Sequence, residues 1–142
     1  MNTLETLNMG KITIEECENI FLCLLKQLKE LEENKLTIPI YNLKDIVKKG
    51  KQYYFSNNSK IFSMDKDMII INKLFVKNEF TSNEMINIDE LPTLIFKTAS
   101  YWSLGKIIEH CLRGKNIKYS KLSWALKRCL ENNPKNRYLI YI

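Results

Sequence analysis

The sequence predicts a mainly α-helical fold of the α+β class with a few short β-strands, built as one domain over residues 1–142. Three stretches carry this prediction: residues 13–33, 98–112 and 120–130. In each of them apolar residues recur three and four positions apart, which puts them on one face of a helix. The chain is long enough to bury a core of its own.

The stretch from Thr98 to Leu112 predicts the central helix. Its apolar positions are Tyr101, Leu104, Ile107, Ile108, Cys111 and Leu112, and Trp102 widens the apolar face. A helix that is apolar over most of its circumference lies at the centre of a domain. Gly105 costs about 1 kcal/mol relative to alanine inside a helix, so it predicts close backbone packing at this position.

A long amphipathic helix is predicted before the central one. Thr13 and Glu16 form a capping box, in which each side chain binds one of the free amides at the helix start. The apolar positions that follow, to about Glu33, are Ile14, Cys17, Ile20, Phe21, Leu24, Leu25, Leu28 and Leu31. After the central helix we expect a shorter amphipathic helix over 120–130, and Pro134 suits the first turn of a last short helix.

The middle of the chain predicts three short strands, at 51–55, 60–63 and 68–71. The first two are expected to form a hairpin through the turn at 56–59, because asparagines suit a tight turn. Residues 72–91 are expected to be irregular, no strand is expected before the first helix, and 138–142 are expected to pack down.

Composition narrows the function classes. The apolar fraction of 45% and the aromatic fraction of 11% are typical of a folded protein. No apolar run is long enough to span a bilayer, and no secretory signal is visible, so we expect an intracellular, cytoplasmic protein. The four cysteines form no Cys-x-x-Cys motif, which predicts buried free thiols and neither a zinc site nor a disulfide framework.

The net charge of +6 and the pI of about 9.1 permit an acidic partner or nucleic acid. The densest basic cluster runs from Lys44 to Lys51, and such a run is usually a solvated loop. Nucleic-acid binding is therefore expected to be unlikely, and it would require these lysines.

Three motifs stand in an informative order. Tyr101-Trp102-Ser103-Leu104-Gly105 resembles the central C-lobe helix of protein kinases. Residues 80–84, ending in Glu84, resemble the end of a kinase activation segment, and residues 130–137 resemble the segment in which an Arg follows Asp-Pro. The resemblance implies that Glu84 and Arg137 form a buried ion pair.

The same resemblance implies that catalysis is lost. If Asp45-Ile46-Val47 stands where kinases have Asn-Ile-Leu, the catalytic Asp position falls on Ile40, which cannot accept a proton. Ser100 stands where kinases use an Asp to hold the catalytic loop. The four glycines form no Gly-rich loop, and no ATP-binding lysine is found. We therefore expect no enzyme activity, no cofactor and no catalytic or metal-binding residues.

Two other candidate sites are also expected to be inert. Asp65 or Asp67, near the position of the kinase Asp-Phe-Gly, could bind a cation, but turn acids without a third ligand are usually only solvated. His110 and Cys111 are sequence neighbours on a helix and point to different faces, so a Cys-His nucleophile pair is not expected.

A kinase-like C-lobe without an N-lobe resembles the KIND domain, the kinase non-catalytic C-lobe module of Spire-type actin nucleators. The resemblance covers roughly Leu4 to Arg137 and implies a pseudokinase lobe that binds a protein or peptide partner. Two alternatives stay open: a split or degenerate kinase subunit that takes an N-lobe from a partner, and a basic nucleic-acid-binding domain. The Lys-, Asn- and Ile-rich composition suggests an AT-rich genome, such as that of a large DNA virus or a parasite, and hence a host-cell location if viral.

Overall fold

The structure is a computed structural model that describes residues 2–7, 11–116 and 120–138. Its helices are α1 (Ile14–Glu33), α2 (Asn83–Ile86), α3 (Ala99–Cys111) and α4 (Lys121–Cys129), with short 3-10 turns at η1 (Leu4–Thr6), η3 (Leu43–Asp45) and η4 (Pro134–Asn136). Its strands are β1 (Asn2–Thr3), β2 (Leu36–Thr37), β3 (Ile46–Lys49), β4 (Gln52–Phe55), β5 (Phe62–Asp65), β6 (Met68–Ile71) and β7 (Thr93–Phe96).

The prediction of a mainly helical fold is wrong. Of the described residues, 43% are helical and 18% lie in strands, which form two antiparallel sheets, so the fold is mixed α/β. The strands have at most four residues each, too few for an alternating pattern to stand out in the sequence. Four of these strands, β1, β2, β3 and β7, were not expected at all.

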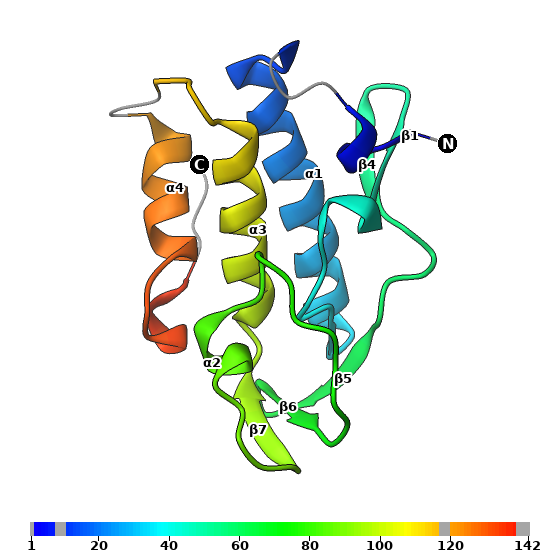
Figure 1. Cartoon of the computed structure of the whole chain (residues 1–142), viewed down its shortest axis with the longest axis vertical. Coiled ribbons are helices and arrows are strands. Elements are labelled where there is room, and N and C mark those ends of the chain that lie inside the picture. The colour runs from blue at the N-terminus through cyan, green and yellow to red at the C-terminus, as the bar shows by residue number, and fades with distance from the viewer. Residues whose placement is uncertain (1, 8–10, 117–119, 139–142) are drawn as a thin grey trace.

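The first sheet has the order β1-β3-β4 and lies beside α1 (Figure 1). β3 and β4 form a hairpin around Gly50, whose φ of +62° lies in the left-handed region that favours glycine. The expected hairpin of β4 with the next strand is therefore wrong, because β4 pairs with β3 and β5 belongs to the other sheet. The lysine-rich run expected as a loop contains η3 and β3.

The second sheet has the order β2-β5-β6-β7 and lies at the end of the molecule opposite the start of α1 (Figure 1). β5 and β6 form a hairpin, and both Lys66 and Asp67 have positive φ in its turn. The inward side chains Ile69, Ile71 and Ile95 build a second, smaller core together with Met85 and Ala99.

Helices α1, α3 and α4 agree with the sequence patterns, whereas α2 lies in the stretch 72–91 that was expected to be irregular. In α1 the Thr13 hydroxyl accepts from the Glu16 amide at 3.1 Å, as expected for the helix start. α3 lies between α1 and α4 (Figure 1), and its residues 99–105 are all buried. A Cβ at Gly105 would lie 2.7 Å from the Cβ of Cys129, so the glycine permits the close approach of α4. At the C-terminus Tyr138 is 55% exposed, contrary to the expected packing, and residues 139–142 lie outside the described residues.

Candidate functional site

The ion pair expected between Glu84 and Arg137 is present. Arg137 Nη2 donates to Glu84 Oε1 at 2.9 Å, and Nη1 donates to Oε2, so the pair is bidentate. The arginine side chain is fully buried, and its remaining donors bind the backbone carbonyls of Thr98, Glu131 and Asn132. With every guanidinium donor satisfied, this buried charge fixes α2 and the segment after α4 at the base of α3.

The other expected residues of the central helix are structural. Trp102 is 8% exposed, and the Arg137 guanidinium lies over its ring at 5.0 Å from the centroid. The Ser103 hydroxyl donates to the Phe80 carbonyl at 2.8 Å, and Leu104 is fully buried. Through Ser103, α3 holds the segment that leads into α2.

Ser100 contacts the chain before η3 through its backbone. The Tyr41 hydroxyl donates to the Ser100 carbonyl at 2.6 Å, while the Ser100 hydroxyl donates to Lys97 O at 3.3 Å. Tyr41 is buried, and this burial raises the pKa of its phenol well above the usual value. A neutral tyrosine therefore connects the chain before η3 to the start of α3.

The two positions that the resemblance placed in the catalytic loop are Ile40 and Asp45. Ile40 is half-buried against the second core. The Asp45 carboxylate accepts a hydrogen bond from the backbone amide of Asn42 at 2.9 Å. The Asn42 side chain accepts one from the backbone amide of Lys44 at 2.9 Å, so the two residues cap η3. The Asp45 side chain thus has a local structural role.

Ile40 and Asp45 both line a cavity of about 850 Å³, which we call the η3 groove. Its size lies in the usual range of ligand sites. One wall comes from η3, β3 and β4, another from the β4–β5 connection at residues 56–60, and a third from residues 75–78. The Ser56 amide donates to the Asp45 carbonyl at 2.7 Å, which fixes the β4–β5 connection to η3.

The charged side chains of the groove are mostly lysines. The lining contains Lys44, Lys49 and Lys60 against Asp45 alone, a formal charge of three minus one, or +2. Lys49 lies over the Tyr54 ring at 5.8 Å from the centroid. Within the described part of the chain, Lys44 and Lys60 form no salt bridge, although both are exposed. The groove therefore presents positive charge that no described carboxylate neutralises.

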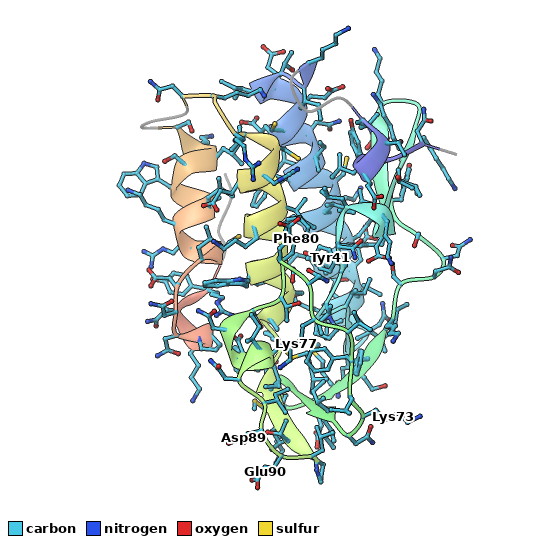
Figure 2. The ribbon with its side chains drawn as sticks, viewed as in Figure 1. Tyr41, Lys73, Lys77, Phe80, Asp89 and Glu90 are labelled. Carbon is cyan, nitrogen blue, oxygen red and sulfur yellow. The ribbon has the colours of Figure 1, made fainter. Side chains whose placement is uncertain are left out.

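Residues 74–76, of which Phe75 and Val76 line the groove, form a segment with exposed apolar side chains. Leu74 is 91% exposed and Val76 is 86% exposed, while Phe75 between them packs into the second core. Residues 73–76 make no backbone–backbone hydrogen bond to any described residue. Lys73 at the start of this segment points outward at the lower right of Figure 2. Two apolar side chains are thus exposed to solvent beside the groove.

The remaining candidates have structural surroundings. Asp67 pairs with Lys97 at 3.2 Å, and neither Asp65 nor Asp67 lines the η3 groove. The His110 ring packs edge-on against Phe80 with the ring centroids 6.0 Å apart, whereas Cys111 is fully buried. No group of three or more metal-ligating side chains occurs among residues 2–7, 11–116 and 120–138.

No protein-family model matches the chain, and no curated protein is significantly similar to it. Nor does any helix in the described ranges have the length and apolar character needed to cross a bilayer.

Sequence reasoning missed most of the groove. It named Ile40 and Asp45 as candidate positions but not Lys60 or Val76, which come from two separate segments. It also treated Lys44 to Lys51 as one basic cluster. The structure divides that cluster, because Lys44 and Lys49 line the groove while Lys48 pairs with Glu16 of α1 at 3.4 Å. The four residues of β3 are too few for their alternation to have revealed this division in the sequence.

Proposed function

We propose that this chain is a non-catalytic, pseudokinase-like lobe that works inside the cell, in the cytoplasm, as a protein-interaction module. The observation that carries the proposal is which side chains stand at positions 40 and 45 of the η3 groove. Ile40 stands at the position of the expected proton acceptor, and the Asp45 carboxylate is engaged in capping η3. The groove thus offers a shaped, charged surface without an acid or base poised for phosphoryl transfer.

The exposed apolar segment at residues 74–76 also supports a binding role. Leu74 and Val76 expose most of their surface beside a groove of ligand size, and a partner that covered them would gain the free energy of removing apolar area from water. The intracellular setting is supported by the cysteines, since Cys17, Cys23, Cys111 and Cys129 are all free thiols, as in a reducing compartment.

Two experiments test this proposal. In a thermal-shift assay, Mg·ATP is expected to leave Tm unchanged, because a ligand raises Tm only when it binds the folded state. A saturable rise of several degrees, or phosphotransfer to a substrate when candidate N-lobe chains are added, would favour the split-kinase alternative.

The second experiment is affinity capture from the native cell, followed by reconstitution of the captured protein with the purified chain. A direct complex, seen as co-elution in size-exclusion chromatography and as saturable heat in calorimetry, is the expected result. Capture of nuclease-sensitive material only would favour the nucleic-acid-binding alternative.

A further inference from the structure

We infer that the η3 groove binds an extended acidic peptide segment of the partner, with an apolar side chain seated against Val76 and carboxylates on Lys44 and Lys60. This inference rests on the proposed function and names the chemistry of its partner. Three observations on separate segments carry it.

The first observation is charge. Lys44 from η3 and Lys60 from the β4–β5 connection line the same groove from different walls, and neither is paired with a carboxylate of the described residues. The Asp45 carboxylate in the groove already accepts a hydrogen bond from the backbone amide of Asn42. The acidic pair Asp89 and Glu90 lies at the tip beside β7 (Figure 2) and contributes nothing to the lining. Carboxylates of a partner are the complement that this arrangement favours.

The second observation is the apolar surface. Ile40, Val47 and Phe62 belong to the lining, and Val76 at its edge is 86% exposed. A side chain of the partner that enters here would remove Val76 and its own apolar area from water. Charge and apolar contact together specify a segment in which acidic residues flank a leucine or phenylalanine.

The third observation is the backbone of residues 73–76. This stretch is irregular, with alternating side chains outward at Leu74 and Val76 and inward at Phe75, and it makes no backbone–backbone hydrogen bond within the described residues. An extended peptide can pair with such a backbone, as in the binding modes that add a strand to an exposed edge.

Nucleic acid is the less favoured ligand of this surface. Phosphate recognition usually includes arginine and a continuous basic track, and single-strand binding adds open aromatic faces. The groove has no arginine in its lining, and the ring of Tyr54, its exposed aromatic side chain, is next to Lys49. Lys48 faces α1, so the basic run does not form one track.

The test measures fluorescence anisotropy of the full chain with three labelled probes. These are the peptide Asp-Glu-Asp-Phe-Glu-Asp-Leu-Asp-Glu, the same peptide with lysine in place of every acid, and a single-stranded oligothymidylate. We expect saturable binding of the acidic peptide alone, weakened by added salt. Failure of the acidic peptide to bind, equal binding of the lysine peptide, or tighter binding of the oligothymidylate would overturn the inference.

Matched variants locate the site. Lys44→Glu combined with Lys60→Glu is expected to lower the affinity for the acidic peptide by about tenfold or more. Lys26→Glu combined with Lys121→Glu makes the same change in net charge at exposed positions on α1 and α4, outside the groove, and is expected to leave the affinity nearly unchanged.

The apolar contact has its own pair of variants. Val76→Ser is expected to weaken binding several-fold, whereas Leu94→Ser, at an exposed position on β7, is expected to have no effect. Equal losses in the groove and control variants would contradict the assigned site. If a captured partner binds the Lys44→Glu, Lys60→Glu chain as tightly as the wild type, the inference fails while the proposed interaction module stands.

Discussion

The guanidinium of Arg137 and the carboxylate of Glu84, 53 residues apart in the chain, form a bidentate ion pair at the base of α3. The arginine side chain has no exposed surface, and Glu84 retains 17%. The Arg137 guanidinium also lies over the Trp102 ring of the central helix. This ion pair therefore joins α2, α3 and the C-terminal segment. The irregular segment that lines the η3 groove leads directly into α2.

Breaking this pair should strongly destabilise the fold. Arg137→Met leaves the Glu84 carboxylate partly buried without its partner, which is expected to cost about 3–5 kcal/mol in the free energy of unfolding. Urea denaturation measures this loss. Lys106→Met, which removes an exposed pair with Glu109, is the control and should cost about 0–1 kcal/mol. Similar values for the two variants would show that the buried pair contributes little.

Gly105→Ala should be destabilising, against the general preference of helices for alanine. The added methyl would lie 2.7 Å from the Cys129 Cβ and 3.0 Å from the Leu130 Cδ2, so α3 and α4 must move apart. Overpacking of this kind costs about 1–3 kcal/mol, against the roughly 1 kcal/mol that alanine gains by helix propensity, so the expected net loss is about 0–2 kcal/mol. Thermal unfolding tests the sign, with Glu109→Ala on the exposed face of α3 as the control. A higher Tm for Gly105→Ala would contradict the close packing.

The buried Cys129 thiol should make the fold less stable in alkali. Burial raises the pKa of Cys129 to about 12, compared with 9.0 for an ordinary thiol, and the nearby Arg137 charge opposes this only in part. Between these pH values the unfolded chain has lost a proton that the folded chain keeps. The free energy of unfolding should therefore fall as pH rises above 9.0, by about 1.4 kcal/mol per pH unit for this group.

Urea unfolding at a series of alkaline pH values measures that slope. Cys129→Ser removes the ionisable thiol, so its slope should be shallower than that of the wild type by the amount given above. Leu130→Ala loses packing at the neighbouring position but keeps the thiol, and its slope should match that of the wild type. An unchanged slope in Cys129→Ser would mean that the thiol ionises equally in both states.

Local signals in the sequence determined the helices of this protein. These signals act over one or two helical turns, so the sequence alone is enough to recognise them. They are the capping residues Thr13 and Glu16, the three-and-four spacing of apolar residues up to Leu31, and the apolar circumference around Trp102. The pairing of Glu84 with Arg137 was also anticipated, from the resemblance of two short motifs. Gly105 predicted close packing at its position, and the helix that approaches there is α4.

Only the tertiary structure decided the sheets and the groove. β3 lies in a lysine-rich run, and besides its local hairpin with β4 it pairs with β1, a contact that no short window contains. Lys44, Lys60 and Val76 meet in the η3 groove because the β4–β5 connection and residues 75–78 fold back over η3. Strand pairing and groove formation depend on contacts between residues that are distant in the chain. In addition, strands of at most four residues leave too weak a local pattern to predict.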